Sequence, residues 1–162
     1  MMRAPSILGR ALICLLLAPI CAATSSAAEP APAEKAANDV KVSVQEFGKV
    51  EVQKHPWGWI RWLMNDRIDP DAEMTFGMVY IKPNQENPAH VHPNSAEYLH
   101  VLEGSCEHLV GTTWVTLKAG DTLRIPKGVP HRARTKEKAC RVVVVYDTGR
   151  RQFVPVEQGK DK

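Results

Sequence analysis

From Val40 onward, apolar and polar residues alternate in short segments that are rich in β-branched and aromatic side chains. A period of two is typical of β-strands with one buried and one solvated face, and Gly, Pro, Asn and Asp between the segments favour turns. The predicted strands are VKVSVQEF, KVEVQ, MTFGMVYIK, AEYLHVLEG, CEHLVG, TWVTLKAG, DTLRIPKG and CRVVVVYD. Their spacing of roughly eight to twelve residues predicts an all-β sandwich or barrel, with tight turns at VGTTW and KAGDT.

The segment WGWIRWLMN, Trp57 to Asn65, departs from this pattern. Its tryptophans at 57, 59 and 62 fit neither a helical nor a strand period cleanly. We expect an irregular or edge strand that covers the barrel. The chain contains no internal repeat that would indicate a solenoid or propeller.

The first 28 residues have the pattern of a secretory signal. Arg3 and Arg10 precede an apolar run at residues 11–23, and Ser26 and Ala28 are small residues at the spacing that signal peptidase needs. The run is short for a membrane span, which needs about 20 residues. We therefore predict a signal peptide at residues 1–28.

An uncleaved membrane anchor is the alternative, but Pro19 inside the short run favours cleavage. Cys21 follows Ile20 rather than a small residue, which argues against a lipoprotein anchor. No other segment is apolar enough to span a bilayer. The sequence predicts a periplasmic or secreted protein without a stable membrane anchor.

Composition divides the remaining chain into three parts. Residues 29–39 are rich in Ala, Pro and charge and predict a flexible linker, followed by one domain at 40–153 and a tail at 154–162. Loss of Arg3 and Arg10 lowers Lys+Arg from 21 to 19 while Asp+Glu stays at 18, so the predicted mature net charge is +1. This balance gives no reason to expect nucleic acid as a partner.

Cys14 and Cys21 lie in the predicted signal, which leaves Cys106 and Cys140 in the mature chain. An exported protein can form a disulfide between them. Both also lie in apolar strand segments, where free buried cysteines are common. Geometry decides between the two states, so the sequence leaves both open.

The segment PAHVHPNSAEYLHVLEG, residues 88–104, places two histidines and a carboxylate close together. Residues two apart share a strand face, so His90 and His92 project together if this segment is extended. We expect Pro93 to begin a turn and Glu97 to return on the next strand, as in a hairpin. Two nitrogens and one oxygen that converge in this way suit a divalent transition metal.

A fourth candidate ligand is His131, in GDTLRIPKGVPHRART. The strand before it ends at Pro126, a glycine-containing turn follows, and His131 begins the next strand. The candidate ligands are therefore His90, His92, Glu97 and His131.

These two segments resemble the two motifs of the cupin superfamily. The first matches as Asn84, five residues, His90-x-His92, four residues, Glu97, six residues and Gly104. The second matches as Gly120, five residues, Pro126-x-Gly128, two residues, His131, three residues and Thr135. The departures are Asn84, where the family has glycine, and Thr135, where it has asparagine. Asn84 still suits a turn, because Asn tolerates a left-handed conformation.

The resemblance covers residues 70–147, and the spacer before Glu97 is similar to that of germins. It implies a single-domain jelly-roll β-barrel of the RmlC-like type, with the metal inside and often a homodimer. All four ligand positions of the family motifs match in this sequence. Fe or Mn is favoured, and Zn, Ni, Cu or Co would also accept three histidines and a carboxylate.

Strand parity sorts the neighbouring residues. Leu99, Val101 and Ala133 should face inward with the ligands, whereas Tyr98 and His100 should face outward. We expect His55 and His108 to have surface or structural roles. The run HRARTKEK should be a solvated face, Thr135 is the best additional polar group, and Arg124 is a weak candidate for a substrate carboxylate.

The predicted site therefore has an apolar pocket suited to a small-molecule substrate, with Glu97 as a ligand that could also accept a proton. We expect a metal-dependent oxidoreductase similar to small dioxygenase cupins. A metal-assisted isomerase, decarboxylase or lyase is the alternative, and a non-catalytic module that binds a metal or small ligand is the third. The family contains all three, so the fold alone does not choose.

Overall fold

The computed structural model describes residues 42–157, and the predicted signal peptide and the whole of the predicted linker lie outside them. The described residues contain strands and one short 3-10 helix, η1 (Phe47–Lys49), and none of their helices is long and apolar enough to cross a membrane. The strands are β1 (Gln53–His55), β2 (Gly58–Met64), β3 (Thr75–Ile81), β4 (His90–Val91), β5 (Glu97–Val110), β6 (Thr113–Lys118), β7 (Thr122–Ile125), β8 (His131–Arg134), β9 (Cys140–Tyr146) and β10 (Val154–Pro155). The all-β prediction is confirmed.

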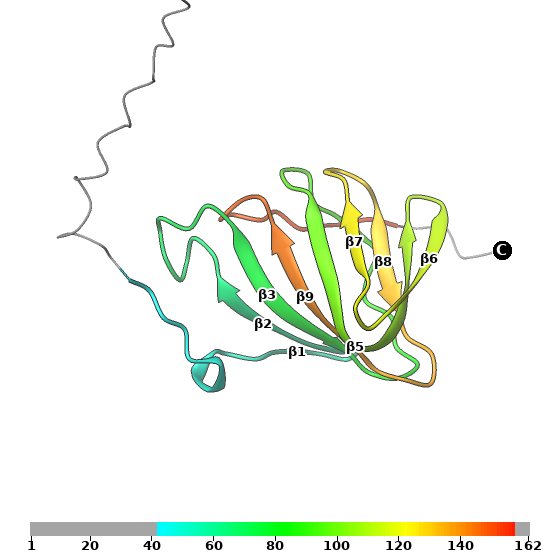
Figure 1. Cartoon of the computed structure of the whole chain (residues 1–162). Coiled ribbons are helices and arrows are strands. Elements are labelled where there is room, and N and C mark those ends of the chain that lie inside the picture. The colour runs from blue at the N-terminus through cyan, green and yellow to red at the C-terminus, as the bar shows by residue number, and fades with distance from the viewer. Residues whose placement is uncertain (1–41, 158–162) are drawn as a thin grey trace, which may run out of the picture. The chain divides into compact units, whose positions relative to one another are not determined.

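The strands form a curled antiparallel half-barrel, consistent with a jelly roll (Figure 1). Strands β1, β2, β3 and β9 lie in order on one side and continue into the first half of β5, which also pairs with β7. The second half of β5 pairs with β6 and β8, and β8 leads through β4 to β10. Strand β5 therefore joins the two sides.

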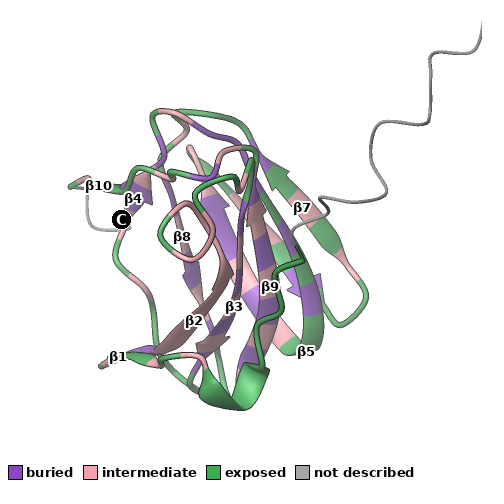
Figure 2. Cartoon of the chain, turned by 90° about the vertical axis from the view of Figure 1, so that its left-hand side faces the viewer, coloured by how far each residue is buried: buried purple, intermediate pink, exposed green. Residues whose placement is uncertain are grey.

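The alternating pattern of β3 and β9 places one face of each strand in the interior. Buried and half-buried residues alternate strictly along both strands, and Figure 2 colours the chain by this burial. On β3, the inward set includes Val79 and Ile81 rather than Met78 and Tyr80. Burial of these branched side chains contributes about 1.5–3 kcal/mol each.

Strand β5 continues through Gly104, where the sequence predicted a turn between two separate strands. The pairing with β9 shifts register between Val101 and Glu103, which is a β-bulge. Gly104 has φ 77°, and a Cβ there would lie 1.8 Å from the carbonyl oxygen of Ala139. The glycine therefore allows the strand to bend from one sheet into the other instead of ending it.

The N-terminal strand predictions were wrong. VKVSVQEF contains no strand in its described part, and only Gln53 of KVEVQ belongs to one. Val42 and Val44 are 75% and 76% exposed, so their alternation has no neighbouring strand against which to bury a face. A two-residue period gives a stable strand only where a partner completes its hydrogen bonds.

The tryptophan-rich segment forms β2, a seven-residue strand with a register shift between Trp62 and Met64. It lies between β1 and β3, so the irregular strand is confirmed while the edge position belongs to β1. At the other end, β10 (Val154–Pro155) falls in the segment predicted as a tail. Ordered structure therefore continues beyond residue 153.

Candidate metal centre

The structure brings the four predicted ligands together. His90 begins β4, His92 follows it, and Glu97 and His131 are the first residues of β5 and β8. All four side chains are buried, and one donor atom from each lies within 4.8 Å of the others. The ligand set predicted from the sequence is therefore a spatial cluster.

The hairpin expected between the histidine pair and Glu97 is absent, because β4 and β5 are not paired. Instead β4 pairs with β8, which puts His90 directly opposite His131 with their ring centroids 4.2 Å apart. Glu97 comes from the opposite side of the half-barrel, where it pairs with Ile125 and Tyr146. The cluster thus forms where the two sheets face one another.

Backbone carbonyls fix the orientation of each imidazole. The Nδ1 atoms of His90, His92 and His131 lie 2.8, 2.6 and 2.8 Å from the carbonyl oxygens of Pro88, Gln152 and Val129. A carbonyl only accepts, so each Nδ1 carries the proton and each Nε2 keeps its lone pair. This arrangement is typical of histidines that bind metals through Nε2.

The Nε2 atoms converge on the carboxylate of Glu97. Its Oε2 lies 3.0 Å from Nε2 of His131 and 3.2 Å from Nε2 of His92. The second contact is an approach without hydrogen-bond geometry, because His92 Nε2 is buried and has no hydrogen-bond partner. An orphaned buried nitrogen of this kind is expected where a missing ligand completes the site.

The four residues fit a divalent transition metal. Bonds of about 2.1 Å at right angles would place neighbouring ligand atoms about 3 Å apart, which matches the observed separations from Glu97. Three neutral imidazoles and one carboxylate leave such an ion with net positive charge. The donor set accepts most first-row divalent ions, so it does not identify the metal.

The electrostatics of the cluster favour a carboxylate ligand. Burial raises the pKa of Glu97, but the close contacts with His131 and His92 outweigh it and leave the pKa well below its usual value. Burial, followed by the charge of the neighbouring His131, lowers the pKa of His90 to about 3. Burial opposes protonation of His131, but contact with Glu97 outweighs it and raises that pKa. The negative charge at Glu97 is the one that a cation would neutralise.

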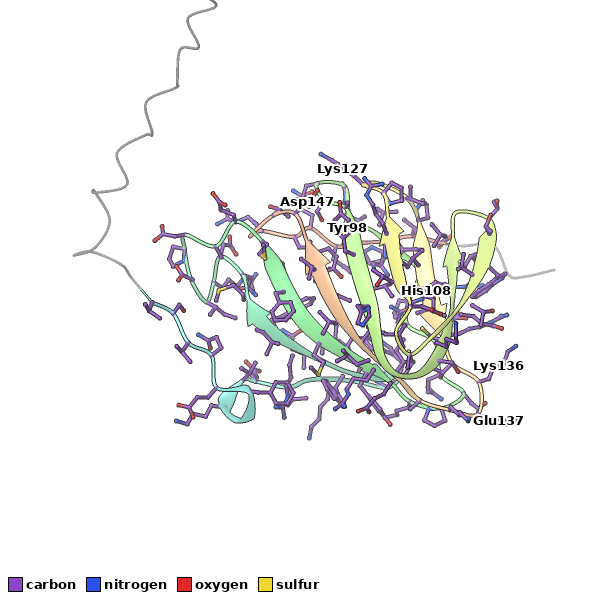
Figure 3. The ribbon with its side chains drawn as sticks, viewed as in Figure 1. Tyr98, His108, Lys127, Lys136, Glu137 and Asp147 are labelled. Atoms are coloured by element: carbon purple, nitrogen blue, oxygen red, sulfur yellow. The ribbon has the colours of Figure 1, made fainter. Side chains whose placement is uncertain are left out.

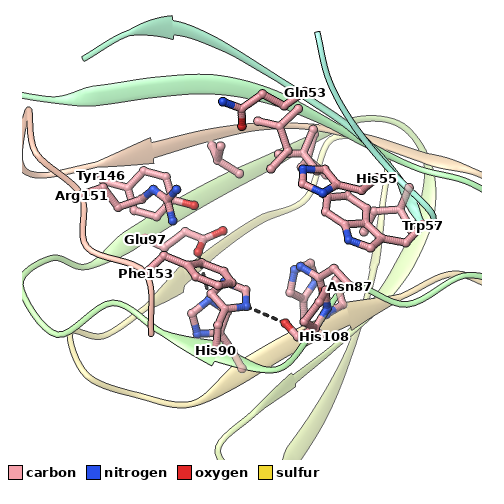
Figure 4. A pocket seen from close by; sticks show the side chains of 18 of the residues that line it. Gln53, His55, Trp57, Asn87, His90, Glu97, His108, Tyr146, Arg151 and Phe153 are labelled. Carbon is pink, nitrogen blue, oxygen red and sulfur yellow. Dashed lines mark hydrogen bonds and ion pairs between the residues drawn. The ribbon is translucent and has the colours of Figure 1, made fainter. Parts of the chain in front are cut away.

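A cavity of about 480 Å³ opens beside the cluster, and three ligands, His90, Glu97 and His131, line it (Figure 4). Its walls are mainly apolar and aromatic. The remaining lining residues are Gln53, His55, Trp57, Ile60, Trp62, Val79, Ile81, Asn87, Pro88, His108, Ala133, Val142, Val144, Tyr146, Arg151 and Phe153. The volume suits a small organic molecule.

His108 faces this cavity and lies within the curl of the strands, although the sequence favoured a surface or structural role (Figures 3 and 4). The bulge between Val101 and Glu103 inverts the parity of β5, so even-numbered residues point inward beyond it. Cys106 is inward for the same reason, and its Sγ lies 3.7 Å from Nδ1 of His108. Parity counted from Glu97 could not reveal this, because the bulge depends on pairing with β9.

Two other groups of lining residues were missed. His55 stacks on Trp57 with ring centroids 4.7 Å apart at the end of the cavity away from Arg151 (Figure 4). Arg151 and Phe153 belong to the C-terminal segment, residues 150–155, which lies outside both sequence motifs. Phe153 stacks on His90 at 4.6 Å and so helps to enclose the cluster.

The outward and inward positions that strand parity predicted near the ligands are confirmed. His100 and Tyr98 are exposed, while Leu99, Val101 and Ala133 are buried.

The polar candidates Thr135 and Arg124 do not line the cavity. Thr135 is buried but donates to the carbonyl of Lys82, so it organises the connection between β3 and β4. Arg124 hydrogen-bonds the hydroxyl of exposed Tyr98. Neither residue supplies the additional polar contact that the sequence predicted for a substrate.

HRARTKEK is a solvated face only in part. The side chain of Arg132 is 11% exposed and pairs with Glu86. Arg134 and Lys136 pair with Glu107, and Arg134 lies over the ring of Trp114 at 3.7 Å.

Cys106 and Cys140, the cysteines of the described residues, form no disulfide. Cys106 and Cys140 are both buried and their thiols interact, which raises the pKa of Cys106 and lowers that of Cys140.

Residues 77–146 match the family profile described as "Cupin domain". With both motifs spaced as that superfamily has them and all four ligand positions clustered, these residues form a cupin domain. No curated protein sequence matches the chain significantly.

Solved structures of similar fold include oxalate decarboxylases. That of Lactobacillus farciminis, in complex with formate, is 17% identical with a TM-score of 0.62, over 67% of this chain and 34% of that chain. That of Bacillus subtilis at pH 4.6 is 18% identical with a TM-score of 0.60, over 68% and 31%. The chain spans about a third of the length of these proteins, and identities this low indicate a shared fold.

Proposed function

We propose that this protein is an exported metal-dependent oxidoreductase that acts on a small organic molecule, similar in kind to dioxygenase cupins. The observation that carries the proposal is the position of His90, Glu97 and His131 in the wall of the apolar cavity. A site built only to store or stabilise would have its ligands enclosed. Here a molecule in the cavity would meet the metal directly.

A bound Fe or Mn ion would supply redox chemistry with O2. His90, His92 and His131 would hold it through Nε2, and Glu97 would hold it through a carboxylate oxygen. The low pKa of Glu97 favours a ligand over a proton acceptor at neutral pH. Burial lowers the pKa of His108 to about 4, so this side chain faces the cavity as a neutral hydrogen-bonding group.

The apolar walls perform a second task, which is to exclude water. Tyr146 lines the cavity beside Glu97. Burial raises the pKa of Tyr146 well above the usual value, so its hydroxyl stays protonated. Phe153 covers His90 from the C-terminal segment. A dry site strengthens the electrostatic contacts between substrate and protein and limits side reactions.

A metal-assisted decarboxylase or lyase is the second candidate, and the fold shared with oxalate decarboxylases favours it. In that case the metal would act as a Lewis acid on a bound carboxylate or carbonyl. A binding module without turnover would show no conversion of any tested compound.

Metal analysis combined with an oxygen electrode tests the proposal. Purified protein is assayed for bound Fe, Mn, Zn, Ni, Cu and Co, and then for O2 uptake with enediols and phenols. Near-stoichiometric Fe or Mn with substrate-dependent O2 uptake supports the oxidoreductase. Bound metal with substrate conversion but no O2 uptake would replace it with the lyase class.

The proposed export and homodimer need separate measurements. N-terminal sequencing of protein recovered from the periplasm or medium should begin at Glu29, the first residue after the predicted signal. Light scattering of the same sample should give the mass of a dimer.

A further inference from the structure

Arg151 is a cation held in the wall of the cavity beside the metal cluster (Figure 4). Its guanidinium carbon lies 4.6 Å from the ring centroid of Trp62, 5.1 Å from that of Tyr146 and 5.7 Å from that of Phe153. These contacts with ring faces fix the position of the charge. They do not satisfy the N–H groups, which lie in the plane of the guanidinium and need acceptors.

No acceptor for these N–H groups is found among residues 42–157. Arg150 pairs with Asp66 and Arg141 with Glu103, but no carboxylate pairs with Arg151. Its Nη1 lies 3.4 Å from Nδ1 of His92. That nitrogen already carries a proton donated to Gln152, so it cannot accept a second one.

Arg151 is half-buried, so its guanidinium is available to donate to an anion that enters the cavity, and hydrogen bonds between two charged groups are strong. A carboxylate matches best, because its two oxygens accept from the guanidinium in parallel. The location beside His92 puts such a carboxylate next to the metal cluster. The anion would therefore lie between Arg151 and the metal.

The end of the cavity away from Arg151 indicates what the ligand carries besides its carboxylate. His55 and Trp57 stack almost in parallel there, with 3° between the rings, and aliphatic side chains such as Val79 and Val142 line the space between. These surfaces suit a flat apolar body. We propose that Arg151 is a substrate-binding residue that anchors the carboxylate of a small organic acid with a planar apolar body. This deepens the proposed function by naming its substrate class.

Benzoate and benzamide test the anchor, because they share shape and differ in charge. Each is titrated into metal-free protein at pH 7.5, and binding is followed by calorimetry and by the fluorescence of Trp57 and Trp62, which line the cavity. We expect benzoate to bind at least about tenfold more tightly than benzamide. Equal affinities, or no detectable benzoate binding, would overturn the proposal.

Arg151→Gln should reduce benzoate affinity about tenfold, to the level of benzamide, and leave benzamide binding unchanged. Arg151→Lys keeps the charge without the planar fork and should lie between the two. Arg150→Gln is the matched control, because Arg150 is solvent-exposed and its side chain pairs with Asp66, and it should bind as the wild type does. Retained preference for benzoate in Arg151→Gln would show that the arginine is only a structural contact of the three rings.

The melting temperatures of both Arg151 variants show that they are folded when binding is measured. The test is independent of the metal, so its failure is distinguishable from failure of the proposed oxidoreductase. Discrimination by charge without O2 uptake would keep the anchor and reject the oxidation. O2 uptake with no discrimination would keep the oxidation and reject the anchor.

Discussion

The Nδ1–H of His92 donates to the main-chain carbonyl of Gln152 across 2.6 Å, although 60 positions separate them in the chain. The C-terminal segment therefore orients one of the candidate metal ligands. Asn94 fixes that segment in turn, because its side chain accepts from the backbone N–H of Gln152 and donates to the carbonyl of Arg150. Outer contacts of this kind affect metal affinity without touching the metal.

Asn94→Ala should therefore weaken metal binding about tenfold, because Gln152 loses its anchor and His92 its fixed orientation. Competition with a chromogenic chelator measures the affinity. Asn87→Ala is the control, since the side chain of Asn87 accepts from the backbone N–H of Ala133 and not from the C-terminal segment. An unchanged metal affinity in Asn94→Ala would mean that the contact is not needed to orient His92.

His92→Ala should abolish stoichiometric metal while leaving the β-rich circular dichroism spectrum largely intact. The substitution removes one of three nitrogens from the cluster, and the strand pairings stay in place. Inductively coupled plasma mass spectrometry of dialysed protein measures the loss. His100→Ala should retain the metal, because His100 is exposed and bonds Thr122. Full metal content in His92→Ala would refute the site assignment.

Removal of the metal should lower the melting temperature. A ligand that binds only the folded state adds about 4 kcal/mol at a free concentration a thousand times its dissociation constant. Scanning calorimetry before and after treatment with a chelator measures the change, and added metal should restore it. The melting temperature of His92→Ala should not respond to either treatment.

Gly104→Ala should destabilise the fold by more than about 3 kcal/mol, because the new Cβ would overlap the carbonyl oxygen of Ala139 at 1.8 Å and φ is 77°. Gly111 provides a matched control, with φ 60° and no atom within 4 Å of its Cβ position. Gly111→Ala should cost only about 1 kcal/mol of backbone strain. Urea denaturation measures both, and equal costs would contradict the close packing assigned to Gly104.

Stability should fall as the pH drops below about 6.5, partly because of His108. Burial lowers the pKa of His108 from its usual 6.5 to about 4. Between these values the unfolded chain binds a proton that the folded chain refuses, so acid favours unfolding by about 3 kcal/mol from this residue.

Urea denaturation at pH 7 and pH 4 measures this dependence in wild type and in His108→Gln. The variant should lose about 3 kcal/mol less than the wild type over the same range. The metal ligands are common to both proteins, so their titration cancels in the difference. Parallel curves would show that His108 is protonated in the folded state.

The motif at Asn84 illustrates how much local sequence could predict. The cupin pattern has glycine there, and the structure gives Asn84 a left-handed φ of 55°, as expected for the substitution that best tolerates it. The spacing of His90, His92, Glu97 and His131 likewise identified residues that converge. Such positions are predictable because each motif encodes a short strand end and its turn.

The hairpin prediction was wrong because spacing along the chain does not determine which strands pair. Local spacing shows that His92 and Glu97 are five residues apart, but it does not show which strands pair. In the structure β8 pairs with β4, and Glu97 reaches the cluster from the opposite sheet. The motif spacing therefore identified the correct residues, although the predicted strand pairing between them was wrong.

By itself, the sequence determined the all-β class, the motif spacing and the identity of the four candidate ligands. Only the tertiary structure decided that His108 faces the cavity, that Gln152 orients His92 and that Arg151 has no carboxylate partner among residues 42–157. The first depends on a bulge set by pairing with β9, and the other two depend on a C-terminal segment that joins β4 through β10. Strand periodicity describes neighbours along the chain, whereas these relationships arise from register and closure between strands far apart in it.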